Sequence, residues 1–310
     1  AYLRRVFEVR RPVRRARLYM TAAGIYEPHL NGRTVGDARL APGWTDYKTR
    51  VPYQTHDVTA QLRPGANVIG AIVAAGWFSG RSGLGSNVYG FDEALLAQLA
   101  IDYDDGTSEL IVTDASWQGT TGPHRFADLL DGELYDARRE LPGWDTPRGR
   151  GEGWRPVVIA TPQVGRLGAA MIPPERETAS LVATAVTSPA PGVQIFDLGQ
   201  NIAGRARVSL GRLAAGQTVS VRYGEMLERD GRLFVGNLRT AIATDRYVGR
   251  GSGREVFEPR FTYHGFRFVE VSGHGGRLPQ SAVVGLVTHT DVPMVGRFAT
   301  SDPRLDRLPA

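Results

Sequence analysis

The chain of 310 residues contains no cysteine. Disulfides, thiolate nucleophiles and cysteine-based zinc sites are therefore excluded. The absence favours a reducing, cytoplasmic compartment and leaves secretion open, and the arginine-rich start lacks the apolar core of a signal peptide. No apolar run approaches the roughly 20 residues that cross a bilayer, so we expect no membrane partner.

Lysine is almost absent as well. Lys48 is the only one, so arginine supplies nearly all the positive charge behind the formal net charge of +5. Arginines cluster near the start of the chain, at Arg4, Arg5, Arg10, Arg11, Arg14, Arg15 and Arg17. Such a cluster fits a patch for an acidic polymer, a solvated strand face, or a face that docks on another domain. No helix-turn-helix, zinc-finger or RNP pattern accompanies it, so we expect no nucleic acid partner.

Several catalytic signatures are missing too. The sequence has no HExxH motif, EF-hand loop, Gly-x-Ser-x-Gly elbow or phosphate-binding loop. The glycine-rich residues 80–85 lack the Lys-Ser/Thr ending of a phosphate loop, and we interpret them as a flexible loop. The scattered histidines favour no transition metal. Calcium stays open, because loop carboxylates, amides and carbonyls bind it without a compact signature.

The chain does contain a clear strand pattern. Short runs rich in Val, Ile, Tyr and Phe recur between Gly, Pro, Asn and Asp, at residues 17–22, 68–74, 95–101, 109–113, 204–210, 218–223 and 266–271. Asn31-Gly32, Asp105-Gly106 and Asp230-Gly231 predict hairpin turns. Residues 94–100 give the best helical signal, but they suit a buried strand at least as well. The sequence therefore predicts an all-β fold.

A boundary between two β-sandwich domains is predicted near residues 155–175. All five tryptophans lie before residue 160, and residues 161–174 carry the Pro and Gly of a linker. We predict a first domain over residues 1–160, a second over residues 161–288, and a tail over residues 289–310. The tail contains Ser301-Asp302-Pro303, which is typical of a capped helix start.

Two loops of the first domain have the chemistry of carbohydrate sites. In such sites an aromatic ring lies against the C–H face of a sugar and polar groups bind its hydroxyls. One loop carries Trp44 and Asp46, and the other carries Trp77, Arg81 and Asn87. We predict these five residues as sugar ligands. The alternative is that both tryptophans are core residues at strand ends, although the polar neighbours Asp46 and Asn87 favour the first interpretation.

Three carboxylates of the second domain, Glu225, Glu228 and Asp230, stand close together in the sequence. Two carboxylates about 6.5–9.5 Å apart can carry out inverting glycoside hydrolysis. A charged strand end and turn explain the same residues, and we favour that interpretation.

Longer strings point to a family. Residues 42–47 read Pro-Gly-Trp-Thr-Asp-Tyr, residues 131–138 Asp-Gly-Glu-Leu-Tyr-Asp-Ala-Arg, residues 196–204 Phe-Asp-Leu-Gly-Gln-Asn-Ile-Ala-Gly, and residues 261–270 Phe-Thr-Tyr-His-Gly-Phe-Arg-Phe-Val-Glu. In this order they resemble the N-terminal and concanavalin-like modules of bacterial α-L-rhamnosidases, glycoside hydrolase family 78. The resemblance covers essentially the whole chain.

The resemblance implies a jelly-roll first module, which in some members binds L-rhamnose with calcium. By this resemblance, Asp46 and Asn87 are the positions that contact calcium and sugar. The residue after Asp46 is an amide in the binding members, whereas it is Tyr47 in this chain. The resemblance also implies a concanavalin-like second module. In the family, two glutamates on an (α/α)6 barrel that follows these modules hydrolyse terminal α-L-rhamnose with inversion, and the resemblance implies the same reaction for the parent protein.

No residue of this chain matches the family's catalytic motif, so we predict no catalytic residue. The expected partners are L-rhamnose or rhamnosides and a missing C-terminal catalytic domain. Three functions remain: the accessory part of an α-L-rhamnosidase, a stand-alone calcium-dependent carbohydrate-binding protein, or a scaffold that docks the barrel. The Gly-Gln-Asn corner of residues 199–201 is expected to be a structural turn that faces the barrel.

Overall fold

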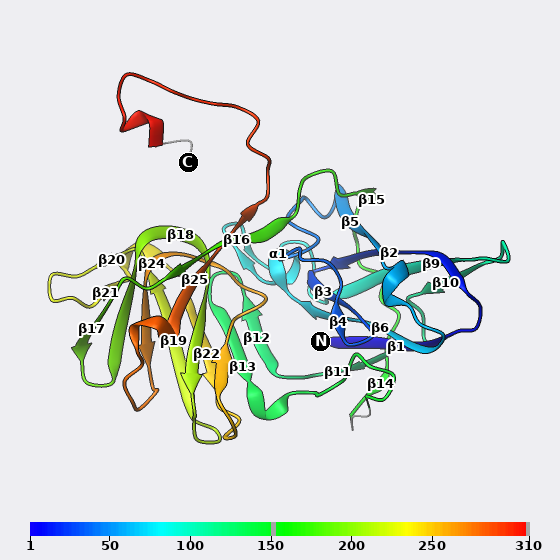
Figure 1. Ribbon diagram of the computed structural model, residues 1–310, viewed down its shortest axis with the longest axis horizontal. Helices are drawn as coiled ribbons and strands as arrows, with labels where there is room; N and C mark the ends of the chain where they lie inside the picture. Colours follow the sequence, from blue (N-terminus) through cyan, green and yellow to red (C-terminus); the bar gives the residue numbers. More distant parts are fainter. Residues whose placement is uncertain (150–152, 308–310) are drawn as a thin grey trace.

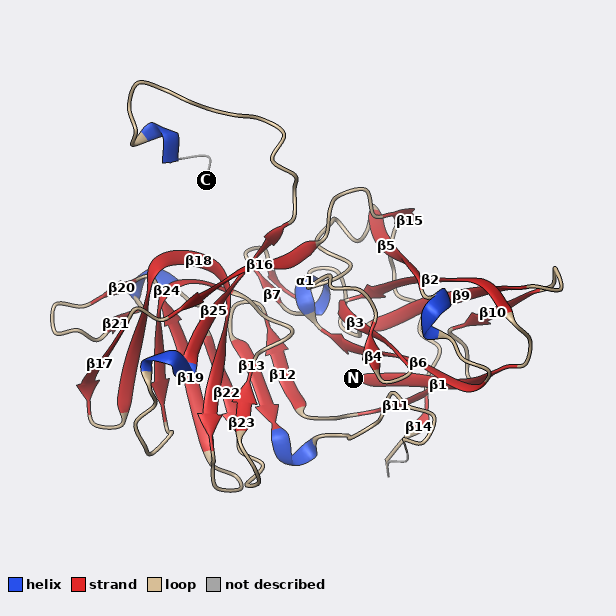
Figure 2. Cartoon of the chain, viewed as in Figure 1, coloured by secondary structure: helices blue, strands red, loops and turns tan. Residues whose placement is uncertain are grey.

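The computed structural model describes residues 1–149 and 153–307, and strands dominate it (Figure 1, Figure 2). The helical elements are single turns: α1 (Gly76–Ser79), η1 (Thr59–Gln61), η2 (Ala137–Arg139), η3 (Gly236–Leu238), η4 (Gln280–Ala282) and η5 (Leu305–Arg307). The predicted all-β fold is confirmed, and residues 94–100 lie in a strand. In the described ranges, no helix is long and apolar enough to span a membrane.

Two facing sheets build the first module. One has the order β14 (Arg155–Pro156), β11 (Gln118–Thr120), β1 (Tyr2–Val9), β6 (Gly65–Ala74), β3 (Ile25–Leu30), β4 (Arg33–Thr34). The other has the order β10 (Ser108–Val112), β9 (Ala94–Tyr103), β2 (Val13–Ala23), β5 (Arg50–Asp57), β15 (Arg166–Ala169). A small hairpin, β7 (Arg81–Ser82) and β8 (Gly85–Ser86), stands apart from both sheets.

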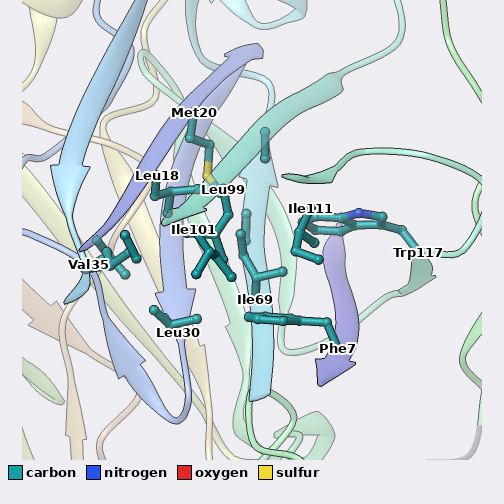
Figure 3. Packing of buried hydrophobic residues seen from close by; sticks show 14 of the residues in the cluster. Phe7, Leu18, Met20, Leu30, Val35, Ile69, Leu99, Ile101, Ile111 and Trp117 are labelled. Atoms are coloured by element: carbon teal, nitrogen blue, oxygen red, sulfur yellow. The ribbon is translucent and has the colours of Figure 1, made fainter. Parts of the chain in front are cut away.

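The core of the first module lies between these sheets (Figure 3). Leu18 and Met20 of β2 and Leu99 of β9 face Phe7 of β1 and Ile69 of β6. Side chains alternate across each strand, so every second residue enters this core. In β2 this alternation leaves Arg15 and Arg17 exposed, while Ala16 and Leu18 are buried.

Some of the N-terminal arginines pair with carboxylates of their own module. Arg5 pairs with Asp114 at 2.9 Å, and Arg15 pairs with Asp102 at 2.8 Å. Arg4 is the buried exception, and its Nη1 donates to the carbonyl oxygen of Trp144 at 2.9 Å. Among the described residues, Arg5, Arg11 and Arg15 of this cluster thus form ion pairs within the first module.

One large curled sheet builds the second module. Its order is β12 (His124–Asp128), β13 (Gly132–Asp136), β22 (Thr244–Val248), β19 (Thr218–Gly224), β24 (His264–Ser272), β18 (Val193–Gly211), β25 (Val283–Thr290), β16 (Glu175–Val182). β17 (Ala185–Ala190) and β23 (Glu255–Phe257) also pair with β18, and β20 (Met226–Leu227) pairs with β21 (Leu233–Phe234). The curled sheet encloses a second core that includes Phe196, Tyr223 and Phe266.

The Gly-Gln-Asn corner is a bend inside β18. The pairing of β18 with β24 shifts register between Asp197 and Ile202. Gly199 has a φ of +77°, and its N–H donates to the Asp197 carboxylate at 2.7 Å. Arg267 also pairs with Asp197 at 2.7 Å, and this hydrogen bond lowers the pKa of that carboxyl. This 19-residue strand pairs with β17 before the bend and with β25 after it.

The chain crosses between the modules more than once. β12 and β13 precede residue 160, yet β13 pairs in parallel with β22 of the second module. β15 lies in the segment that we predicted as a linker, yet it pairs in parallel with β5 of the first module. Gly165 allows this approach, because a Cβ there would collide with the backbone of Thr49. The single boundary near residue 160 stays a prediction, and strand pairing shows that the modules interleave around it (Figure 1).

The tail runs away from the body of the molecule after β25 (Figure 1). Asp302 accepts a hydrogen bond from the Arg304 N–H at 2.9 Å, as a helix cap would. The turn η5 follows, so the expected start lies where the sequence places it but forms one 3-10 turn within the described residues.

Candidate functional site

Trp44 and Trp77 lie against each other, with ring centroids 6.2 Å apart and planes 1° from parallel. Their exposure differs: Trp44 is 50% exposed and Trp77 is 8% exposed. Trp77 belongs to α1 beside the buried Phe78, whereas Trp44 stands on an outer loop. The geometry leaves Trp44 free to lie against a ligand, while Trp77 supports it from below.

A third ring continues this pair from the second module. Tyr263 directly precedes β24 and is 38% exposed. Its ring centroid lies 6.5 Å from that of Trp77, with the planes tilted by 48°. Sequence reasoning missed Tyr263, although the string of residues 261–270 contains it. Trp44, Trp77 and Tyr263, called the aromatic row below, therefore cross the junction between the modules.

Asp46 lies in a turn that its own side chain helps to form. Oδ1 accepts from the Lys48 N–H at 3.1 Å, and Oδ2 accepts from the Thr49 hydroxyl at 2.7 Å. The next residue, Tyr47, points inward and is fully buried, with its ring packed edge-on against Phe78 at 5.5 Å. Asp46 is thus exposed at the surface, while Tyr47 anchors the loop in the core.

Asn87 is an exposed loop residue with a φ of +55°, a left-handed conformation that Asn tolerates. None of the described contacts joins its side chain to Asp46. Across residues 1–149 and 153–307, no three His, Asp or Glu side chains cluster as metal ligands. The side-chain oxygens of Asp46 and Asn87 are of the kind that calcium prefers. The calcium site formed by these two residues stays a prediction.

Arg81 has a different set of partners from the other four predicted ligands. Its Nη1 forms an ion pair with Asp131, and its Nη2 donates to the carbonyl and hydroxyl of Thr240 at 3.1 Å each. Thr240 belongs to the second module. The guanidinium therefore joins the glycine-rich loop to the second module, and these contacts engage it without a ligand.

A hollow of about 550 Å³ opens beside Trp44. The loop of residues 42–45, strand β5 and residues 169–176 form its wall. Burial raises the pKa of Glu175 and lowers the pKa of His56, both of which line the hollow. Trp44 therefore borders a concave surface with apolar and polar parts, which is typical of small-molecule sites.

The three carboxylates of the second module have separate surroundings. Glu225 accepts hydrogen bonds from the side-chain amides of Asn201 at 3.0 Å and Asn237 at 2.9 Å. Asp230 accepts from the Arg232 N–H at 3.1 Å, while the backbone of Glu228 closes the same hairpin. These are the contacts of a strand end and turn, which is the interpretation that we favoured from the sequence.

A buried charge network joins the two modules. His29 contacts Glu27 at 2.9 Å and Asp145 at 2.8 Å, and the guanidinium of Arg260 reaches across from the second module to Glu27. Burial acts to raise the pKa of Glu27, but His29 and Arg260 outweigh it and lower that pKa to about 2. Burial acts to lower the pKa of His29, but its two carboxylate partners raise it above the ordinary value.

A second group of ion pairs borders the same junction. Arg205 is 2% exposed and pairs with Glu258 at 2.9 Å and Glu177 at 3.1 Å. Arg39 of the first module lies 3.5 Å from Glu177 and 3.8 Å from Glu27, so it links the two groups. Charged side chains from both groups, among them Glu27, Arg39 and Glu258, line a cleft of about 370 Å³ between the modules. Most of these charges are already paired, so the network fixes how the modules are placed.

The fold defines this protein as a pair of interleaved β-sandwich modules with an aromatic row across their junction. The description "Alpha-L-rhamnosidase N-terminal domain" matches residues 11–179, and "Bacterial alpha-L-rhamnosidase concanavalin-like domain" matches residues 187–289. The chain belongs to the bacterial α-L-rhamnosidase family, and the resemblance seen in the sequence is confirmed.

Relatives of known name agree with this membership. An α-L-rhamnosidase of Streptomyces avermitilis is 49% identical over 298 residues, which are 96% of this chain and 29% of that protein. A crystal structure of Streptomyces avermitilis α-L-rhamnosidase complexed with L-rhamnose is 48% identical with a TM-score of 0.94, covering 98% of this chain and 30% of the other. An Aspergillus terreus α-L-rhamnosidase structure is 37% identical with a TM-score of 0.90, covering 98% and 36%. The chain thus spans about a third of the length of its relatives.

Proposed function

We propose that this chain supplies the non-catalytic, two-module part of an α-L-rhamnosidase, which hydrolyses terminal α-L-rhamnose from glycosides with inversion. The observation behind the proposal is that both modules match, in order, about a third of the length of proteins that are α-L-rhamnosidases. The catalytic acid and base would lie on a domain outside these residues. The separate surroundings of Glu225 and Asp230 support this division.

The part played by this chain in the proposed enzyme is to hold rhamnoside near the catalytic domain. Trp44 would lie against the C–H face of the sugar, and Asp46 and Asn87 would bind its hydroxyls. The same two side chains would hold a calcium ion, with backbone carbonyls and water completing the six to eight oxygen ligands that calcium takes. The buried network at the junction would keep the sugar surface at a constant orientation.

An assay of the isolated chain with an aryl α-L-rhamnoside tests the non-catalytic part of the proposal. We expect no release of the aryl group above the uncatalysed rate. Turnover that survives repurification and disappears in Glu225→Gln, Glu228→Gln or Asp230→Asn would contradict the proposal, because it would place catalysis within these modules.

A second function, a stand-alone calcium-dependent carbohydrate-binding protein, is favoured by the half-exposed ring of Trp44. L-Rhamnose is titrated into the protein first with calcium and then with a chelator, and binding is monitored by tryptophan fluorescence. The titration tests sugar binding for both proposed functions. We expect a saturable change that Asp46→Ala abolishes. No change at millimolar sugar would exclude direct rhamnose binding and leave only the docking role.

A further inference from the structure

Three segments that are far apart in the sequence hold one exposed carboxylate in a fixed orientation. Glu225 follows β19, Asn201 lies in the bend of β18, and Asn237 lies in η3. Glu225 Oε1 accepts from Asn201 Nδ2 at 3.0 Å, and Oε2 accepts from Asn237 Nδ2 at 2.9 Å. Each carboxylate oxygen has two lone pairs, so each keeps one acceptor position for a ligand. The result is a preoriented bidentate acceptor at the surface.

One position beside Glu225, Gly265, has no side chain. Gly265 of β24 faces outward, and its pairing partner on β18 is the outward-facing Ala203. A Cβ added at Gly265 would have Glu225 Oε1, 3.8 Å away, as its nearest neighbour. Gly265 is not among the residues with positive φ, so its backbone does not require glycine. The missing side chain instead leaves a flat floor next to the carboxylate.

Tyr263 borders this floor on its other side. It lies two residues before Gly265, so both face the same side of the sheet, while His264 between them is buried. Its ring is 38% exposed and contacts Trp77, the middle member of the aromatic row. The floor, the carboxylate and the aromatic row therefore form one continuous strip that runs from the second module to Trp44 in the first.

We propose that this strip binds a second sugar residue of a glycan. The sugar would lie over Gly265, with its C–H face on Tyr263 and two neighbouring hydroxyls donating to the free lone pairs of Glu225. An aromatic ring suits the apolar C–H face of a sugar, and a planar carboxylate suits a pair of its neighbouring hydroxyls. The ligand is then a glycoside of two or more residues, with one residue at Trp44 and the next at Tyr263.

The inference deepens the proposed function and rests on it only for the class of ligand. It assigns Tyr263, Glu225, Asn201 and Asn237 to a site in the second module, whereas the predicted sugar ligands all belong to the first. Arg81 of the first module contacts the segment next to this site, because it donates to Thr240, which follows η3, the turn that contains Asn237.

Calorimetric titration of the chain with L-rhamnose and with a rhamnosyl-glucose disaccharide tests the strip. The disaccharide is expected to bind more tightly than the monosaccharide. Glu225→Gln should weaken disaccharide binding by about tenfold or more, since it replaces one of two charged acceptors, and should leave L-rhamnose binding unchanged. Gly265→Leu should block the floor with the same selectivity, since a Cβ at this position points toward Glu225, 3.8 Å from its Oε1.

Glu228→Gln is the matched control, because Glu228 is an exposed carboxylate of the same hairpin, and none of the described contacts gives its side chain an amide partner. Equal disaccharide affinity in wild type, Glu225→Gln and Gly265→Leu would overturn the inference. So would the lack of any disaccharide binding by the wild type, which would leave Glu225 as a contact for a protein arginine. The inference and the proposed function can fail separately. If Trp44→Ala keeps its L-rhamnose binding while Glu225→Gln still weakens disaccharide binding, the role proposed for Trp44 is wrong and the inference about Glu225 stands.

Discussion

Two adjacent tryptophans of the first module have opposite surroundings, and this difference can be measured. Trp77 is 8% exposed, so Trp77→Ala should lower the free energy of unfolding by about 3–5 kcal/mol, the range for a large buried ring. Trp44 is 50% exposed, so Trp44→Ala should cost less than about 1 kcal/mol and should instead remove sugar-induced fluorescence changes. Denaturant unfolding of both variants checks the pair, and equal losses of stability would contradict the assignment.

Tyr47 gives a second test at the scale of single residues. The family resemblance predicts an amide at this position, but Tyr47 is fully buried against Phe78 and Tyr89. Tyr47→Asn should therefore destabilise the first module by roughly 3 kcal/mol or more, because it leaves a cavity and buries a polar amide. Thermal unfolding measures the loss, and Tyr47→Phe is the control that should stay close to wild type.

Residue-level predictions from the sequence reached only as far as local chemistry. Gly-Trp pairs and neighbouring polar residues identified Trp44 and Trp77 as a pair of interest, but exposure depends on the packing of α1, which no local pattern reports. Arg81 was predicted to bind sugar, and its partners Asp131 and Thr240 lie 50 and 159 positions away. Such long-range partners are set by the tertiary fold.

β18 is the element on which the second module depends, because it pairs with β24 along one edge and with β25 along the other. Gly204 sits where these edges meet, and a Cβ there would collide with the carbonyl oxygen of Leu286. Gly204→Ala should therefore cost roughly 2–3 kcal/mol, as overpacking does. At the neighbouring Gly265 a Cβ would make only an ordinary contact, 3.8 Å from Glu225 Oε1, so Gly265→Ala is the matched control and should change stability by less than about 0.5 kcal/mol.

Thermal unfolding together with hydrogen exchange of the β25 amides measures the effect of Gly204→Ala. Faster exchange in β25 is expected, since the pairing of β18 with β25 is the contact that the added methyl group opens. Stability equal to that of Gly265→Ala would show that the strands shift without cost, contrary to the crowding seen at Leu286.

At this scale the sequence predicts strands well and their partners poorly. Apolar runs at residues 17–22, 95–101 and 266–271 all lie in observed strands, because period-two burial is a local signal. Residues 161–174 were predicted as a linker, yet β15 lies there. Its only sequence signals are Gly and Pro, while its pairing with β5 depends on residues more than 100 positions earlier.

The molecule as a whole is held at its junction by charges that are distant in the sequence. Glu27 and His29 share β3, whereas Asp145 and Arg260 come from two distant segments, so the sequence contains no pattern that predicts the meeting of all four. Removing one partner of a buried ion pair leaves the remaining charges buried and uncompensated. Glu27→Gln should therefore lower the free energy of unfolding by roughly 3 kcal/mol at neutral pH. Asp37→Asn is the matched control: the Asp37–Arg176 pair also bridges the modules at 2.8 Å but is exposed, so its loss should matter little.

The same network predicts a pH range for the stability of the joined modules. Glu27 has a pKa lowered from 4.5 to about 2, so its contribution is complete above pH 4.5 and is lost as the pH falls toward 2. His29 has a pKa raised above 6.5, so its contribution is complete below pH 6.5 and is lost as the pH rises through the raised value. The difference in unfolding free energy between wild type and Glu27→Gln should therefore shrink in acid, and that between wild type and His29→Gln should shrink in alkali. Parallel pH profiles for wild type and both variants, measured by denaturant unfolding, would contradict a charged network at the junction.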